Sequence, residues 1–340
     1  MGTGVALVLF VASVAGSLFV GARPVDPSVV WAVLTTLPGQ FLTGDLAPAL
    51  EPGSGALMDE VVVSARVPRT VTAVLVGAAL AVAGAGLQGA TRNPLGDPGL
   101  LGLTAGAALG VVLGLALAPA ADPSTVAVFA VIGSLVAGAV VIAAGRLGAD
   151  SGTGLVLAGA AVTAGCTAVT SSLVIALPGG LDRFRFWGLG SVARSGAHEI
   201  AAAAPFVLVG LGLVLAGAVT LDAVALGDDL ARGLGAGPAA GRAVVLSGVV
   251  ILSGVATALA GPIAFLGLLV PHLLRRLVGV GNRVVLGLSL LAGPCVLLVA
   301  DTVGRVIAPP GEIAVGVMTV AIGVPFLIGL LRANRGVGGS

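Results

Sequence analysis

RVPRTVTAVLVGAALAVAGAGLQGATRNPLGDPGLLG, residues 66–102, is the most informative segment of the chain. Its apolar run from Val71 to Leu87 has about the length that a helix needs to cross roughly 30 Å of hydrocarbon. A sharp polar turn follows, because Asn93 favours a turn and the prolines Pro94 and Pro98 interrupt regular helix. An apolar helix, a tight turn and renewed apolar sequence predict a chain that crosses a membrane and turns back.

Comparable apolar stretches recur along the whole chain. The 340 residues are 57% hydrophobic and only 9% charged, with a mean hydropathy of +1.16, so polar side chains are too few to cover a water-soluble globule. We therefore predict an all-α integral membrane protein, with about ten transmembrane helices in one bundle. A single domain should occupy residues 1–340. The expected spans are Val5–Val20, Val71–Leu87, Leu100–Ala118, Val126–Ala144, Leu155–Leu177, Ile200–Val219, Ala243–Ala260, Ile263–Val278, Val284–Val299 and Ile313–Leu331.

Glycine is abundant inside these stretches. Pairs such as Gly84 and Gly86, or Gly106 and Gly110, put small residues at helical spacing. In lipid, helices associate through close packing, which small residues permit. The spacing predicts a tightly packed bundle.

An even number of spans puts both termini on one side of the membrane. With cytoplasmic termini, nine arginines would lie on the cytoplasmic side and seven outside, a small excess in the direction of the positive-inside rule. We expect a bacterial cytoplasmic membrane protein with both termini cytoplasmic. Residues 22–64 would then form an extracytoplasmic loop, and residues 221–237 short cytoplasmic helices.

Several functions are excluded by residues that the chain lacks. All 16 basic residues are arginine, so no phosphate-binding loop with its lysine is present, and ATP hydrolysis requires another subunit. A net charge of +1 offers no basic face for nucleic acid. Cys166 and Cys295 lie in apolar runs, and no His or Cys spacing fits a metal. We expect no catalytic residue, metal site or cofactor in this chain.

The segment at residues 220–237 differs from the spans around it. Leu226, Leu230 and Leu234 recur at helical spacing, Asp228 is placed to cap a helix after Gly227, and Gly235 is placed to end it. Such a short amphipathic helix suits the groove of a partner protein. A helix lying on the membrane interface is the alternative.

Two prolines fall within one predicted span, at residues 260–279. Pro262 and Pro271 remove helical hydrogen bonds, which is tolerated in a membrane only where protein or a water-filled cavity satisfies the backbone. His272 beside them is expected to bond a neighbouring helix rather than to catalyse a reaction.

Polar residues elsewhere leave two alternatives open. Arg66, Arg69 and Arg305 lie on the predicted outer side, where guanidinium groups suit an acidic protein or an anionic ligand, or are simply solvated. A polar stripe within one span fits either a wet pathway or hydroxyls bonded to their own helix. The stripe consists of Thr163, Thr167, Thr170 and Ser171.

In their order and spacing, several segments together resemble the permease family of bacterial iron-siderophore, haem and cobalamin ABC importers, the type II importers. They are residues 66–102, FWGLGS at Phe186–Ser191, the stretch Leu226–Gly235, GPIAFLGLLVPHLLR at Gly261–Arg275, and GEIAVGVMT ending at Thr319. A family member usually carries a basic residue before its first helix, which this chain lacks.

The resemblance implies an alternating-access importer of an iron-siderophore or similar metal chelate. Two permease chains, identical or paralogous, would stand with two cytoplasmic ATPases that use ATP and Mg, and with an extracytoplasmic binding protein. The region from Asp222 to Gly237 would contain the coupling helices that seat in the ATPase. The arginines Arg66, Arg69 and Arg305 would meet glutamates of the binding protein.

Two rival functions are weaker. An ion-coupled secondary transporter needs ionisable groups near the membrane midplane, and Asp301 is the best candidate. An intramembrane protease would have to use Ser191 and His272, which no protease motif accompanies.

Overall fold

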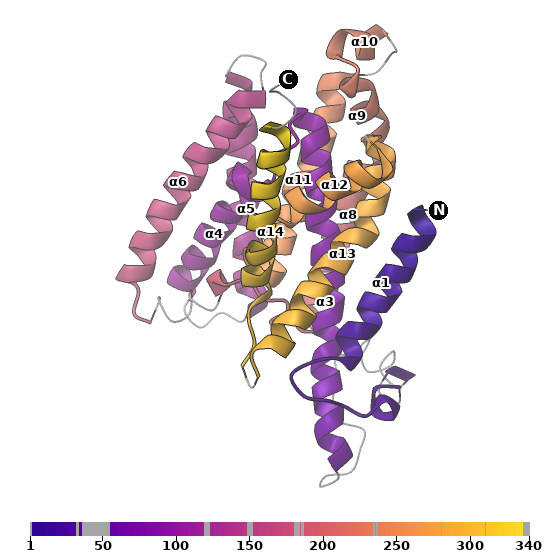
Figure 1. Cartoon of the computed structure of the whole chain (residues 1–340). Coiled ribbons are helices and arrows are strands. Elements are labelled where there is room, and N and C mark those ends of the chain that lie inside the picture. Colours follow the sequence, from indigo (N-terminus) through magenta and orange to yellow (C-terminus); the bar gives the residue numbers. More distant parts are fainter. Residues whose placement is uncertain are drawn as a thin grey trace.

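The computed structural model describes residues 2–31, 34–35, 55–118, 123–147, 152–179, 184, 187–233, 235, 237–279, 281–309 and 311–335. Within these ranges the regular structure is helical (Figure 1). The helices are α1 (Gly2–Phe19), α3 (Gly55–Thr91), the 3-10 helix η1 (Pro98–Leu101), α4 (Leu103–Leu117), α5 (Pro123–Leu147), α6 (Gly152–Ala176), α8 (Ala197–Ala216), α9 (Ala218–Ala225), α10 (Asp228–Gly233), α11 (Pro238–Ala260), α12 (Leu266–Val278), α13 (Asn282–Ile307) and α14 (Val315–Arg335).

Each predicted span coincides with a helix. Among the described residues, 7 helical segments are long and apolar enough to cross a membrane. The remaining predicted spans correspond to the shorter apolar helices at Leu103–Leu117 and Val315–Gly329 and to α12, which has only 13 residues. The prediction of an all-α membrane bundle is confirmed.

Helix α3 is the central element of the bundle. In its most apolar window 83% of residues are buried, against 11% for α1 and 17% for α6. It packs against α8, α11, α12 and α13, while α6 lies outside α4 and α5 (Figure 1). Its 37 residues begin at Gly55, so the helix takes up the end of the loop expected at residues 22–64. At about 1.5 Å per residue it is longer than the hydrocarbon is thick.

The two ends of the bundle differ. One end, called here the Asp228 end, carries α9 and α10, and α1 begins and α14 ends toward it (Figure 1). The opposite end, called the Arg69 end, carries the first turns of α3 and the connection after α1. Both ends of the described chain therefore lie toward the same side, as an even number of spans requires.

Close helix packing depends on glycine, as predicted. A methyl group on Gly84 would collide with the backbone of Gly267 in α12, and one on Gly106 with the backbone of Gly133 in α5. Gly77 and Gly293 bring α3 and α13 equally close. Backbones at this separation gain dispersion contacts that larger side chains would prevent.

The turn after α3 has the predicted form. Asn93 accepts a hydrogen bond at Oδ1 from the Leu95 N–H (2.9 Å), and Asp97 accepts one from the Gly99 N–H (2.8 Å). Pro98 begins η1, where its missing N–H costs nothing. Arg92, with φ 51°, has the left-handed conformation that non-glycine residues rarely adopt.

The helix break occurs at Pro262 but not at Pro271. α11 ends at Ala260 and α12 begins at Leu266, so Pro262 lies in the irregular connection. Pro271 does not form the expected turn, because α12 continues through it to Val278. Its missing N–H leaves the carbonyl of Gly267 without a helical donor, and the Gln88 amide of α3 donates to that oxygen (3.1 Å).

Candidate functional site

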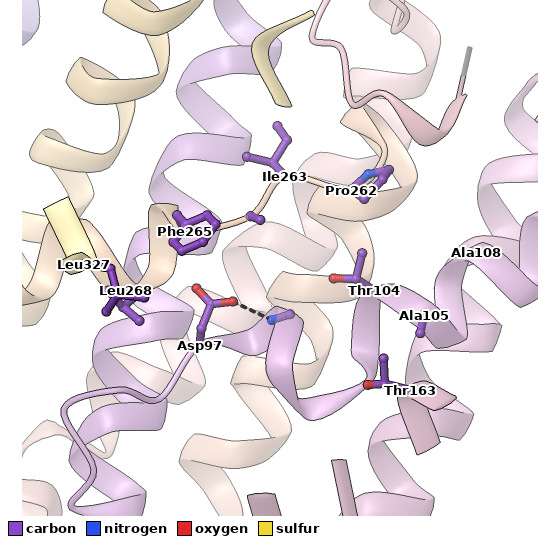
Figure 2. A pocket seen from close by; sticks show the side chains of 12 residues that line it. Asp97, Thr104, Ala105, Ala108, Thr163, Pro262, Ile263, Phe265, Leu268 and Leu327 are labelled. Atoms are coloured by element: carbon purple, nitrogen blue, oxygen red, sulfur yellow. Dashed lines mark hydrogen bonds between the residues drawn. The ribbon is translucent and has the colours of Figure 1, made fainter. Parts of the chain in front are cut away.

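A cavity of about 470 Å³ opens at the break between α11 and α12 (Figure 2). The break itself, η1, α4, α6 and α14 contribute to its wall. Its lining includes Asp97, Thr104, Thr163, Pro262, Phe265 and Leu268. Apart from Asp97 and two threonines this lining is apolar, so the cavity suits a ligand with a large non-polar surface.

Asp97 is held at the edge of this cavity. Its side chain is 8% exposed, and the hydrogen bond from the Gly99 N–H fixes its orientation at the start of η1 (Figure 2). Sequence analysis identified the turn around Asp97 and missed its place in a cavity wall. That place depends on α12, which lies far away in sequence.

The polar stripe on α6 is divided by the fold. Thr163 lines the cavity, although its hydroxyl donates to the Gly159 carbonyl of its own helix (2.8 Å). Thr170 is buried at 5% exposure, whereas Thr167 and Ser171 are exposed on the outside of the chain. Only Thr163 of the four lines the cavity at the helix break.

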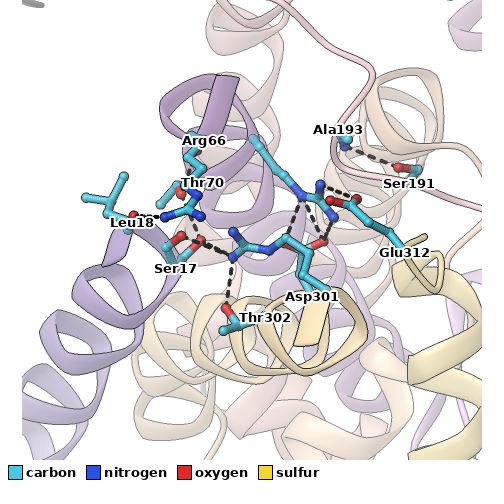
Figure 3. A network of polar contacts seen from close by, with 11 residues as sticks. Ser17, Leu18, Arg66, Thr70, Ser191, Ala193, Asp301, Thr302 and Glu312 are labelled. Carbon is cyan, nitrogen blue, oxygen red and sulfur yellow. Dashed lines mark hydrogen bonds and ion pairs between the residues drawn. The ribbon is translucent and has the colours of Figure 1, made fainter. Parts of the chain in front are cut away.

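At the Arg69 end, two of the three predicted arginines, Arg66 and Arg305, bind the end of α1, and Figure 3 shows Arg66 beside Leu18. Arg66 donates to the carbonyls of Leu18 (2.9 Å) and Phe19 (3.3 Å), and Arg305 donates to the carbonyl of Ser17 (3.1 Å). These are carbonyls of the last helical turn, which have no partner within the helix. Arg66 is 5% and Arg305 2% exposed, so both guanidinium groups tie α1 to α3 and α13.

The third arginine, Arg69, is paired with two carboxylates, Asp301 and Glu312, which Figure 3 labels. Its Nε and Nη2 atoms bond both oxygens of Asp301 at 2.8–3.1 Å, and its Nη1 bonds Glu312 (2.6 Å). Asp301 is 1% exposed and Glu312 is 41% exposed. Arg305 Nε also lies 3.2 Å from Asp301, without the alignment of a hydrogen bond.

A small cavity of about 270 Å³ adjoins this cluster, with Arg23, Arg66, Arg69, Arg305 and Glu312 in its wall. Four guanidinium groups around one exposed carboxylate make a site suited to acidic side chains. Sequence analysis found three of these arginines but missed Glu312 and the burial of Arg66 and Arg305.

At the Asp228 end, two short helices, α9 and α10, connect α8 to α11. Gly227, with φ 109°, separates α9 from α10, so Leu226 lies in the turn before α10 rather than on its face. Leu226 and Leu230 are 61% and 62% exposed. Leu234 lies outside the described residues, and Gly235, with φ 77°, has the left-handed conformation of a residue following a helix.

Asp228 is the first residue of α10, and its carboxylate binds arginines from two other segments. Both oxygens accept hydrogen bonds from Arg242 of α11 (2.7 and 2.8 Å), and Arg92 lies 3.2 Å away. The hydrogen bond from Arg242 holds the pKa of Asp228 below its usual range. Asp222 of α9 in turn accepts from the Asn282 N–H at the start of α13 (2.8 Å).

The residues of the two rival functions are engaged elsewhere. Asp301 is paired with Arg69 and is not a free acid. Ser191 accepts from the Ala193 N–H (3.2 Å), while the His272 ring packs edge-on against Phe326. Among the described residues no hydrogen bond joins Ser191 to His272, and no group of three or more His, Cys, Asp or Glu is placed to hold a metal.

Residues 7–333 match the family model described as the FecCD transport family. The chain belongs to this family. The FecCD match covers nearly the whole sequence, and confirms the resemblance to permease subunits of siderophore, haem and cobalamin importers. The chain is thus a multi-pass permease subunit of an ABC importer, in which the ATPase is a separate subunit.

Individual relatives agree with the FecCD assignment. The chain is 39% identical over 328 residues to the ferric enterobactin transport system permease protein FepD of Escherichia coli (strain K12), covering 96% of this chain and 93% of that protein. It is 36% identical to the Fe(3+)-citrate import system permease protein YfmD of Bacillus subtilis (strain 168), covering 97% and 94%. A solved metal-chelate type ABC transporter in an inward-facing conformation superposes with a TM-score of 0.74 at 27% identity, covering 90% of this chain and 99% of that chain.

Proposed function

We propose that this chain forms, with a second identical or paralogous permease chain, the membrane pathway of an ATP-driven importer of a ferric chelate. Its relatives FepD and YfmD are named for ferric enterobactin and ferric citrate. The cavity at the break between α11 and α12 carries the proposal, because it combines a mostly apolar wall with an interruption of the bundle. Both features suit passage of a bulky ligand by alternating access.

The Asp228 end is the proposed cytoplasmic side, which places both termini in the cytoplasm. There the exposed Leu226 and Leu230 offer an apolar edge to the ATPase that binds ATP and Mg, and the sequence spacing predicts Leu234 as a third residue of the same contact. The left-handed turns at Gly227 and Gly235 bound the element. The pairs of Asp228 with Arg92 and Arg242 join α10 to the end of α3 and the start of α11, so movement of α10 reaches α11, which ends at the break beside the cavity.

The Arg69 end is the proposed docking face for the extracytoplasmic binding protein. Arg69 with the exposed Glu312 is the exchangeable pair, since an incoming carboxylate replaces Glu312 while Asp301 stays buried. Arg66 and Arg305 bind the end of α1 and lie buried beneath the same surface. Docking through Arg69 therefore requires no rearrangement of the buried network.

Reconstituted transport tests this function directly. The permease is purified with its ATPase and binding protein, placed in vesicles, and supplied with ferric enterobactin, ferric citrate, haemin or cobalamin. We expect ATP-dependent uptake of a ferric chelate. Uptake driven by a proton or sodium gradient without the ATPase would contradict the proposal and favour a secondary transporter.

Haem or cobalamin is the second candidate cargo. The chain is 38% identical over 276 residues to the hemin transport system permease protein HmuU of Yersinia pestis and 37% identical over 301 residues to the cobalamin import system permease protein BtuC of Halobacterium salinarum. These values are close to the value for FepD, so the panel of ligands and not sequence identity decides between cargos.

Docking is tested separately with Arg69→Glu and Glu312→Gln. Reversal at Arg69 should abolish attachment of the binding protein to the permease, while removal of the competing Glu312 charge should strengthen that attachment several-fold at low salt. Arg232→Glu, an exposed reversal at the opposite end, is the control for docking. Unchanged docking in both test variants would remove the assignment.

A further inference from the structure

A groove lies between α5 and α8, on the outside of the bundle. Both helices pack against α11 and contact each other little, so α11 forms the floor. The resulting space, called here the α5–α8 groove, has a volume of about 540 Å³. Its apolar lining consists of Ala127, Val128, Val131, Ile132 and Leu135 of α5, Ala202, Ala203 and Phe206 of α8, and Val255, Ala258 and Leu259 of α11.

The dimensions of the groove match one leaflet of a membrane. From Ala127 to Leu135 it follows α5 for about 12 Å, at roughly 1.5 Å per residue. Half of a hydrocarbon core is about 15 Å deep. The rim residues Val128, Ile132 and Phe206 are more than half exposed, as expected for side chains in contact with lipid.

Three polar residues close the groove at the Arg69 end, namely Arg194, Ser195 and Glu199. Ser195 donates to the carbonyl of Leu259 (2.8 Å), and Glu199 Oε2 accepts from the Gly196 N–H (3.0 Å). Arg194 has no hydrogen bond or ion pair with any residue that the structure describes. The Arg194 side chain is exposed at this end of the groove, where a ligand can reach it.

We propose that the α5–α8 groove binds a membrane phospholipid, with one acyl chain in the groove and the phosphate on Arg194. A guanidinium group presents paired N–H donors that match phosphate oxygens. The position of Arg194 just before α8, which begins at Ala197, puts it at the level where a lipid headgroup lies. One phospholipid molecule then covers the apolar groove with an acyl chain and places its phosphate against the Arg194 guanidinium group.

Native mass spectrometry of the full chain in maltoside detergent tests the site. Dioleoylphosphatidylglycerol and dioleoylphosphatidylethanolamine are compared with dioleoylglycerol, which has the same chains but no phosphate. We expect the wild-type chain to retain both phospholipids about tenfold better than dioleoylglycerol. Arg194→Gln should remove that difference, and Arg232→Gln, which removes an equal charge at the other end, should leave it intact.

A second pair of variants tests the groove itself. Ala202→Trp places an indole in the groove, and we expect retention of all three lipids to fall. Ala201→Trp is the matched control, since Ala201 is exposed on the same helix but does not line the groove. Equal phospholipid retention by the wild type and Arg194→Gln would overturn the proposal. So would a dimer in lipid-free detergent that Ala202→Trp disrupts, because the groove would then be a protein interface.

Discussion

The side-chain amide of Gln88 donates to the carbonyl oxygen of Gly267 (3.1 Å), the acceptor that Pro271 leaves without a helical donor. The same amide donates to the Gly96 carbonyl (3.2 Å), and its oxygen accepts from Arg275. One residue of α3 thus supports the half-length helix α12 and the turn before η1. This contact holds α12, which contributes Leu268 to the cavity wall, against α3.

Replacement of Gln88 by Leu should destabilise the bundle by about 1–3 kcal/mol, because the buried Gly267 carbonyl loses its partner. Pro271→Ala restores an N–H to that carbonyl and should recover part of the loss. A double-mutant cycle on thermal unfolding midpoints in detergent measures the coupling. Strictly additive effects would mean that Gln88 does not compensate for Pro271.

Gly84→Ala should cost about 1–3 kcal/mol, since the added methyl collides with the Gly267 backbone and separates α3 from α12. Gly287→Ala is the matched control in a helix, because its methyl would meet nothing within 4 Å. Alanine there should be neutral or slightly stabilising. Similar midpoints for the two variants would contradict the close packing at Gly84.

Arg66→Gln should release the last turn of α1. Loss of charge-assisted hydrogen bonds to Leu18 and Phe19 is expected to cost about 1.5–3 kcal/mol, which corresponds to roughly tenfold or more in protection. Hydrogen exchange of residues 15–20 measures this loss. Arg283→Gln, at an exposed arginine of the other end, should leave α1 protected, and equal exchange in both variants would refute the anchoring role.

Asp228→Asn should weaken the link from α10 to α11 and α3. We expect ATP hydrolysis to continue while ligand uptake per ATP falls several-fold, as measured in vesicles. Asp229→Asn is the adjacent control, because Asp229 is 98% exposed and pairs along the helix with Arg232. An equal loss in both variants would assign the effect to surface charge.

The pH dependence of this link has a definite sign. Arg242 lowers the pKa of Asp228 in the folded chain. The stabilisation is therefore complete above the ordinary aspartate pKa and is lost as pH falls through the lowered one. Uptake by the wild type should show no Asp228-dependent change between pH 6 and 8, and such a change would contradict the pairing.

Much of the fold is predictable because its signals are local. Apolar runs of spanning length, the turn residues Asn93 and Pro94 and the break at Pro262 all act within a few residues of themselves. The error at Pro271 has a non-local cause. A proline can stay within a helix when another group donates to the carbonyl that its missing N–H leaves unbonded. Here that donor is Gln88, far away in sequence.

The site was less predictable for the same reason. Sequence analysis selected Arg66, Arg69 and Arg305 but had no means to separate them by role. Their separation follows from where α1 ends and from Glu312, which only the assembled bundle brings together. Likewise, Asp228 was expected to cap α10. Its carboxylate instead accepts a hydrogen bond from Arg242, which lies in another helix.

The short length of α12 has an electrostatic consequence. Because the helix starts at Leu266 beside the cavity, its partly positive first turn lies at the cavity wall. The Asp97 carboxylate lies next to that turn and offsets the helix dipole. The two charges oppose each other at this wall, so neither the helix end nor the carboxylate alone sets the potential there.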